Sequence, residues 1–170
     1  MIVKNTIDGM PLWLLARPEH SNDLLEAPQP FLLVNQYDSE EASSLAPTHE
    51  LIQVVFNPKV IRDFCNHNTM AIPIKKSYRN LSNLIVLGRS EGSDIIITRK
   101  EVSKSHCGFY RMNKHWYVTD LESLNGISVD GYKTQKKLSS QSIILVGGAI
   151  EVAFITATDL AFLAAEISSF

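Results

Sequence analysis

Pairs of turn-forming residues divide the second half of the chain into short apolar runs, and this spacing restricts the fold more than any other feature. Asn, Asp and Gly tolerate the positive φ that two-residue hairpin turns require. The pairs are Asn113-Lys114, Asn125-Gly126, Asp130-Gly131 and Gly147-Gly148. The runs between them are short and include β-branched residues, which favours strands. We therefore predict strands at 71–74, 84–87, 95–97, 107–111, 116–119, 127–129, 142–146 and 149–154.

Closely spaced turns with no long helix between them are typical of an antiparallel β-sandwich. Residues 157–167 differ, because they are rich in Ala and Leu and have a Thr158-Asp159 start, which predicts a C-terminal helix docked on the sandwich. The expected fold is mainly β, with a mixed N-terminal extension and a short C-terminal helix. The expected division is 1–70 for an extension of unknown role, 71–156 for the sandwich and 157–170 for the helix.

The N-terminal extension carries few clear patterns. Residues 31–34 and 51–56 are apolar enough to be buried strands, and the acidic, serine-rich residues 38–48 are expected to form a mobile loop. Asn57-Pro58 predicts a helix start, because Asn caps helices and Pro lacks only an N–H that would be unsatisfied there. We expect a small segment of mixed secondary structure that packs against another part of the protein or against a partner.

Composition limits the class of protein. The chain has 170 residues, of which 45% are hydrophobic and 20% charged, as in an ordinary soluble domain. No apolar run approaches the ~20 residues that span a membrane, and the N-terminus lacks the order of a signal peptide. Two cysteines provide no disulfide framework and no metal spacing. We expect a cytoplasmic protein with no cofactor and no metal.

Charge is unevenly distributed. Residues 1–70 hold four Lys/Arg against nine Asp/Glu, residues 71–137 hold twelve against six, and residues 138–170 hold none against three. A basic middle between acidic ends is typical of a module that meets an anionic partner, and it also occurs as scatter on a solvated surface.

Polar residues in three loops between the predicted strands form a set that can bind an anion and a peptide backbone. Arg89 supplies a cation with a planar fork of donors, and Ser103 supplies a hydroxyl. Lys104 adds charge or a backbone N–H. Asn125 offers a donor and an acceptor together, which suits a peptide main chain. A phosphorylated side chain, with close to two negative charges and three acceptor oxygens, matches this set.

The order and intervals of Gly88-Arg89, Ser103-x-x-His106 and Asn125-Gly126 resemble a forkhead-associated (FHA) domain, over about residues 72 to 155. The resemblance implies a β-sandwich that binds phosphothreonine peptides. It implies that Arg89 and Ser103 bind phosphate and that Asn125 holds main-chain groups of the ligand. The family often has a polar side chain at the position of Leu124, so this polar contact must use the backbone or be absent.

The remaining motif residues are expected to shape the loops. The resemblance implies that His106 is a structural histidine that stiffens them. Asp120 and Ser123 have the spacing of side-chain-to-backbone hydrogen bonds in a turn. Gly88 and Gly126 are interpreted as conformational requirements.

The sequence departs from the family pattern at three places. Ile127 follows Asn125-Gly126 where the family has Thr, and Ser140-Gln141 replaces the usual Gly-Asp. Asp130 stands where the family has Asn and could weaken anion binding if it faces the ligand.

Three other functions compete with phosphopeptide binding. A hydrolase would use Ser103 as nucleophile, His106 as base and Asp120 as its orienting group, but the chain lacks a nucleophile elbow. A phosphorylation-independent scaffold, for example in a secretion or assembly system, and a nucleic-acid-binding protein are further alternatives. The favoured hypothesis is a non-catalytic adaptor in Ser/Thr kinase signalling. Its partner would be a phosphothreonine-containing protein or peptide, without nucleic acid, membrane or small-molecule substrate.

Overall fold

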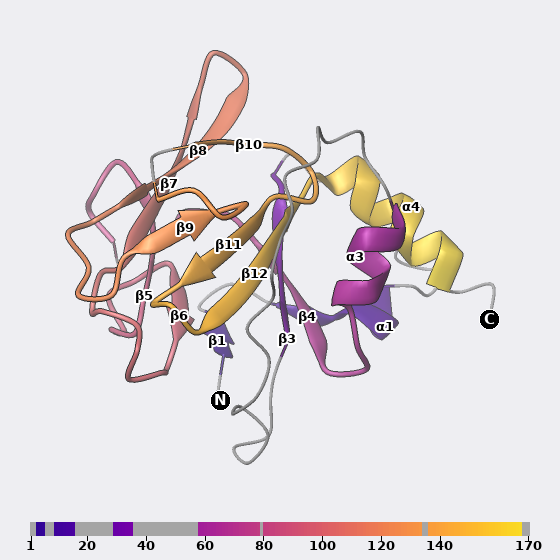
Figure 1. The fold of residues 1–170 in the computed structure, drawn as a ribbon, viewed down its shortest axis with the longest axis horizontal. Helices are drawn as coiled ribbons and strands as arrows, with labels where there is room; N and C mark the ends of the chain where they lie inside the picture. Colours follow the sequence, from indigo (N-terminus) through magenta and orange to yellow (C-terminus); the bar gives the residue numbers. More distant parts are fainter. Residues whose placement is uncertain are drawn as a thin grey trace.

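The computed structural model describes residues 3–5, 9–15, 29–35, 58–78, 80–133 and 136–167. Two six-stranded sheets pack face to face, and helices lie on the outer side of one of them (Figure 1). The chain is therefore mainly β, with a β-sandwich and a C-terminal helix, as the turn spacing predicts. Within the described residues, no helix has the length and apolar character needed to cross a membrane.

The first sheet has β1 at one edge and β10 at the other. Its order is β1 (Val3–Asn5), β6 (Ile95–Ile97), β5 (Ile85–Gly88), β7 (Cys107–Met112), β8 (His115–Asp120) and β10 (Lys136–Leu138). The expectation of purely antiparallel pairing is wrong at one place, because β5 and β6 run parallel. Only Leu87 with Ile95 and Gly88 with Ile96 pair there. Since β6 begins beside the end of β5, the short segment 89–94 is long enough to connect them.

The second sheet combines N-terminal and C-terminal strands. Its order is β2 (Met10–Pro11), β4 (Thr69–Pro73), β3 (Phe31–Asn35), β12 (Ile150–Ile155), β11 (Ile143–Val146) and β9 (Ile127–Val129). All its pairs are antiparallel among the described strands. Strand β3 is internal, with β4 on one side and β12 on the other.

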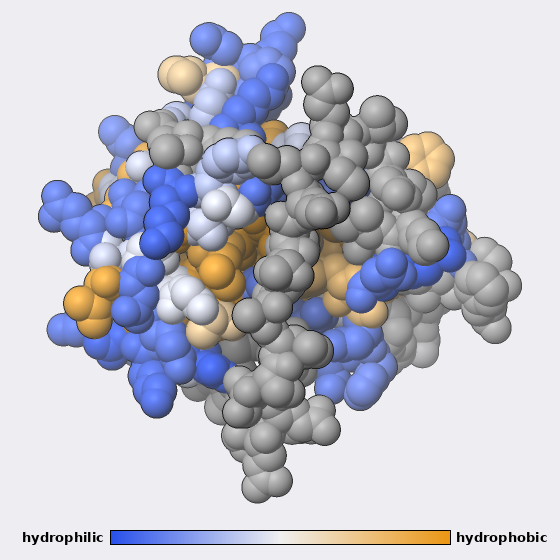
Figure 2. Space-filling model, viewed as in Figure 1, coloured by the Kyte–Doolittle hydropathy of each residue, from blue (hydrophilic) through white to orange (hydrophobic). Residues whose placement is uncertain are grey.

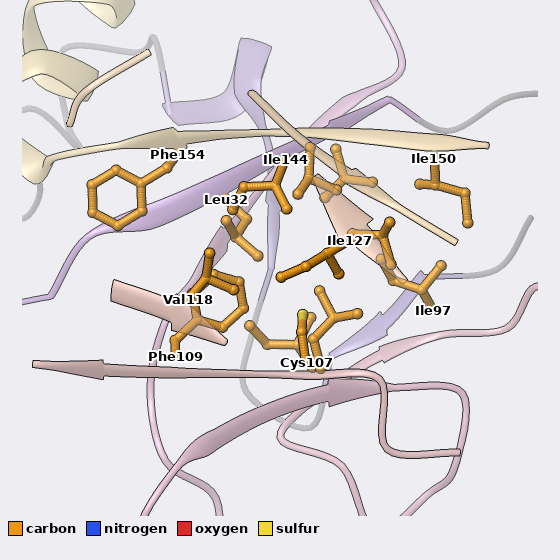
Figure 3. Close-up of a cluster of buried hydrophobic side chains, with 14 of the residues drawn as sticks. Leu32, Ile97, Cys107, Phe109, Val118, Ile127, Ile144, Ile150 and Phe154 are labelled. Atoms are coloured by element: carbon orange, nitrogen blue, oxygen red, sulfur yellow. The ribbon is translucent and has the colours of Figure 1, made fainter. Parts of the chain in front are cut away.

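Apolar side chains from both sheets fill the space between them (Figure 3). Phe109 and Val118 of the first sheet meet Leu32, Ile144 and Phe154 of the second, and all five are buried. Burying side chains of this size stabilises the fold by about 1.5–3 kcal/mol each. This core holds the two sheets in fixed positions, and it thereby fixes the loops at their ends.

A second core lies on the outer face of the second sheet. Helices α1 (Leu12–Leu15), α3 (Pro58–Phe64) and α4 (Ala157–Ile167) gather on that side (Figure 1). Their buried residues include Leu12, Ile61, Leu160 and Leu163, which cluster with Phe31 and Leu33 of β3. Strand β3 is therefore buried on both faces, and such strands show no alternation of polar and apolar residues.

Local signals explain the ends of these elements. Thr156 caps α4, because its Oγ1 accepts a hydrogen bond from the Asp159 backbone N–H at 3.2 Å. The hairpin turns have the expected positive φ, at Asn113 (49°) and Lys114 (67°) and at Asp130 (49°) and Gly131 (84°). The predicted helix start at Pro58 and the C-terminal helix are both present.

The predicted boundary between residues 70 and 71 does not separate two units. It cuts through β4, and β3 lies between β4 and β12 in one sheet. Pairing between Phe31 and Ile155 is too distant in sequence for local patterns to indicate. The predicted loop 38–48 and strand 51–56 lie outside the described residues.

Candidate functional site

Backbone hydrogen bonds bring the three predicted site segments together at one end of the sandwich. The Arg89 N–H donates to the Ser103 carbonyl at 3.0 Å, and the Ser90 N–H donates to the Lys104 carbonyl at 3.3 Å. The third segment joins through Leu124, whose N–H donates to Ser103 Oγ at 3.0 Å. The loops next to β5, β6 and β9 thus form one surface, and hydrophilic residues dominate the described surface there (Figure 2).

The buried side chain of His106 connects two of these loops. Its Nδ1 accepts a hydrogen bond from the Ser103 N–H at 2.9 Å, and its Nε2 lies 3.0 Å from the Gly126 carbonyl oxygen. A carbonyl only accepts, so Nε2 carries the proton and the ring is the neutral tautomer with Nδ1 as acceptor. These contacts are the ones that a loop-stiffening histidine requires.

Asp120 and Ser123 hold the turn before Asn125. The Asp120 carboxylate accepts the backbone N–H of Ser123 at 3.0 Å and also its hydroxyl, and Ser123 Oγ accepts the Gly126 N–H at 3.0 Å. Gly126 itself has φ of +71°, in the region that favours glycine. The turn is therefore ordered by its own side chains before any ligand is bound.

Gly88 is required for a different reason. A Cβ at this position would lie 2.1 Å from the Lys104 carbonyl oxygen and 2.7 Å from Ser93 Oγ. No side chain fits in that space, so the close approach of the Arg89 and Ser103 segments depends on a glycine here.

The predicted ligand-binding side chains are open to solvent. Arg89, Lys104 and Asn125 are exposed, and Leu124 is 88% exposed. One amide proton of Asn125 is used, because Nδ2 donates to the Glu101 carbonyl at 2.9 Å. Its Oδ1 and second N–H are oriented by that bond. Ser103 Oγ accepts from Leu124, and its own proton can be donated to a ligand.

A pocket beside Arg89 contains residues that sequence reasoning missed. Arg89, Thr98, Arg99 and Lys100 line a cavity of about 230 Å³. Arg99 is anchored by Glu101, with Nε 3.1 Å from Oε2. A hydrogen bond from its own backbone and the neighbouring Arg99 lower the pKa of Glu101, which keeps it ionised. The run of one hydroxyl and two cations shortly before Ser103 was a signal that could have identified this pocket.

Ser103, His106 and Asp120 are not arranged as a catalytic triad. His106 bonds to the backbone N–H of Ser103, not to its hydroxyl, and Asp120 bonds to Ser123, not to His106. Burial raises the pKa of the Cys65 thiol to about 12, which removes its nucleophilic character near neutral pH. In the part of the chain that the structure describes, no three His, Cys, Asp or Glu side chains gather as a metal site.

Asp130 has a structural partner. Its Oδ1 accepts the backbone N–H of Ile143 at 2.8 Å, beside the β9–β11 pairing. Its side chain is thus committed to the sheet.

Part of the chain is similar to a known domain family. Residues 85–147 match the family model of the FHA domain. This part of the chain is similar to the FHA domain family. No curated protein sequence matches the chain. The FHA domain model covers all three loops of the site, while β3 and β4 of the same sandwich precede the matched residues.

Several solved FHA domain structures match this chain at low identity, with TM-scores below 0.5. The FHA domain of the CT664 protein from Chlamydia trachomatis is 16% identical, covering 74% of this chain and 96% of that chain, with a TM-score of 0.47. A structure from work on phosphothreonine-dependent FHA domain interactions is 13% identical, covering 74% and 96%, with a TM-score of 0.46. The MEK1 FHA domain in complex with the HOP1 pThr318 peptide is 24% identical, covering 51% and 87%, with a TM-score of 0.39.

Proposed function

We propose that this protein binds phosphothreonine-containing segments of partner proteins through the loops that carry Arg89, Ser103 and Asn125. The observation that supports this most directly is the pairing of Arg89 and Ser103. Their backbones are joined at 3.0 Å, and Ser103 Oγ is held as an acceptor by the Leu124 N–H. The serine proton is therefore available for a ligand, in a segment bonded directly to that of Arg89.

Arg89 has the properties of a residue that binds phosphate. It is exposed, it follows the end of β5, and it has no ion-pair partner among the described residues. An arginine fork forms charge-assisted hydrogen bonds with a phosphate, and Lys104 adds a second cation beside Ser103. Both cations are therefore available to an anion that binds between these loops.

Asn125 would hold the main chain of the ligand. The bond from its Nδ2 to the Glu101 carbonyl fixes the amide plane and leaves one donor and one acceptor. A peptide main chain offers the complementary pair. We propose that the protein uses this arrangement as a non-catalytic adaptor in Ser/Thr kinase signalling.

A screen of a degenerate phosphothreonine peptide library against the purified chain tests the proposal. Calorimetry then measures the affinities of the single peptides that the screen selects. The purified chain should bind phosphorylated peptides and not their dephosphorylated forms. Equal binding of both forms would show that the loops do not recognise phosphate.

A phosphorylation-independent scaffold is the second candidate, and one observation favours it. Leu124 is 88% exposed in the loop that carries Asn125, where the family often has a polar side chain. Exposed apolar side chains are a common feature of protein contacts. A partner whose binding survives phosphatase treatment would support this candidate.

A further inference from the structure

Arg89 separates two groups of donors. On one side its N–H bonds to Ser103, which is followed by Lys104. On the other side, β5 pairs with β6, and the residues after β6 form the pocket of about 230 Å³ with Arg89. That pocket contributes Thr98, Arg99 and Lys100. Arg89 therefore borders both groups, through its backbone N–H on one side and as a lining residue of the pocket on the other.

The two groups contain the same types of donor. The first has the hydroxyl of Ser103 and the ammonium of Lys104. The pocket has the hydroxyl of Thr98 and the ammonium of Lys100, with the guanidinium of Arg99 in addition. A hydroxyl with a guanidinium and an ammonium is a donor set suited to phosphate. If one group binds phosphate, the other has the chemistry to do the same.

Among the described residues, the loops carry three cations that are not held in ion pairs, together with the acidic residues Glu91 and Glu122. Arg89, Lys100 and Lys104 have no ion-pair partner in the described part of the chain. One phosphate carries about −1.5 to −2 at neutral pH, so it compensates about two of these three cations. The Glu101 carboxylate contacts only the Nε of Arg99. The terminal N–H groups of the Arg99 guanidinium can still donate to a ligand.

We propose that the pocket of Thr98, Arg99 and Lys100 binds a second phosphate of the same ligand, so that the preferred ligand is a doubly phosphorylated peptide. The inference rests on the proposed function, since it assigns the first phosphate to Arg89 and Ser103. Strands β6 and β7 flank β5. Strands lie about 4.8 Å apart, so the two groups are separated by roughly 9.6 Å, and an extended peptide covers this in about three residues. The two phosphates should lie about two to four residues apart.

Calorimetry on the full chain tests this with a series of peptides. Each carries one phosphothreonine, and a phosphoserine is placed one to six residues before or after it. The pocket variant is Arg99→Gln with Lys100→Gln. The matched control is Arg111→Gln with Lys114→Gln, which removes the same two side-chain types from the exposed end of the β7–β8 hairpin (Figure 1).

The expected result is about fivefold tighter binding of one doubly phosphorylated peptide than of its singly phosphorylated parent, as for exposed ion pairs. This gain should disappear in the pocket variant and persist in the control variant. A gain that is equal at all spacings, or lost equally in both variants, would mean long-range charge attraction and would overturn the inference. No gain at any spacing would also overturn it, while binding of the single phosphothreonine leaves the proposed function intact. If neither peptide binds, the proposed function fails and this inference fails with it.

Discussion

His106 Nε2 lies 3.0 Å from the carbonyl oxygen of Gly126, twenty residues further along the chain. The same ring accepts the Ser103 N–H, so one buried imidazole satisfies a polar group in each of two loops. The arrangement ties the segment that carries Ser103 to the segment that carries Asn125. Loss of the ring should therefore loosen both loops together.

His106→Ala should destabilise the fold and weaken peptide binding together. It removes the partner of the Ser103 N–H, while the Gly126 carbonyl keeps the Gly147 N–H, and it creates a cavity in place of the buried ring. The expected cost is about 2–4 kcal/mol. For a chain of this size, the melting temperature should fall by about 5–12 °C. His115→Ala is the control, because His115 is exposed on β8 and its side chain contacts Lys137 of β10, away from the three loops. Unchanged stability of His106→Ala with loss of an enzymatic activity would favour the hydrolase alternative instead.

Arg89→Ala should weaken binding of a phosphothreonine peptide without unfolding the protein. Hydrogen bonds to charged groups contribute about 1.5–3 kcal/mol, so we expect a roughly ten- to hundredfold loss by calorimetry. Arg89→Lys should restore little, because a point charge does not replace the fork. Arg111→Ala, an exposed arginine on the hairpin, should bind as the wild type does. Undiminished binding by Arg89→Ala would place the phosphate site elsewhere.

Gly88→Ala should destabilise the fold strongly, although it adds only one methyl group. The new Cβ would lie 2.1 Å from the Lys104 carbonyl oxygen, so the strand end and the Ser103 loop must separate. Gly92→Ala is the matched control, because the nearest atom to its added Cβ is Ser90 Oγ at 3.6 Å. Thermal denaturation should show a lower melting temperature for Gly88→Ala and little change for Gly92→Ala. Equal stability of the two variants would contradict the close approach.

Strands and turns of the second half of the chain were predictable because their signals are local. Asn113-Lys114 and Asp130-Gly131 have residue types that favour turns, and they adopt the positive φ of hairpin turns at the ends of β7 and β9. The role of β3 was not predictable in this way. Its residues are buried alternately by the other sheet and by the helices, so no periodicity marks its faces. Its partners β4 and β12 are also far along the chain.

The candidate site was predictable to a similar extent. Arg89, Ser103 and Asn125 stand in a recognisable order, and the structure brings their segments together. The pocket residues Thr98–Lys100 were missed, because their proximity to Arg89 depends on the parallel pairing of β5 with β6. No turn signal in the sequence indicates a parallel pair.

A chain that begins at Ala71 should fail to fold. It lacks β3, whose Leu32, Leu33 and Val34 are fully buried. At about 1.5–3 kcal/mol for each side chain, the loss is about 5–9 kcal/mol, comparable with the total stability of a domain. A chain that begins at Gln29 retains β3 and should remain more soluble and better folded. If the Ala71 chain is soluble and binds phosphopeptides more tightly, residues 1–70 instead shield the site.

Threonine should be preferred over serine in the ligand, and the structure limits what can cause this. Phosphothreonine and phosphoserine carry the same charge and acceptors, so Arg89 and Ser103 cannot distinguish them. The difference is one methyl group, and its burial contributes about 0.8 kcal/mol, or about fourfold in affinity. Of the apolar residues beside Asn125, Ile127 is buried in the core, while Leu124 is 88% exposed. Leu124 is therefore the side chain available to cover the methyl group.

A matched pair of peptides, identical except for phosphothreonine or phosphoserine, measures this preference by calorimetry in one buffer. The wild type should favour phosphothreonine by about fourfold or slightly more, because the β-branch also restricts χ1 before binding and lowers the ordering cost. Leu124→Ala should reduce the preference while phosphate recognition by Arg89 continues. Met112→Ala, which removes another exposed apolar side chain on the β7–β8 hairpin, should leave it unchanged. Equal affinities of the two peptides for the wild type would remove the methyl contact and would indicate a general anion site in its place.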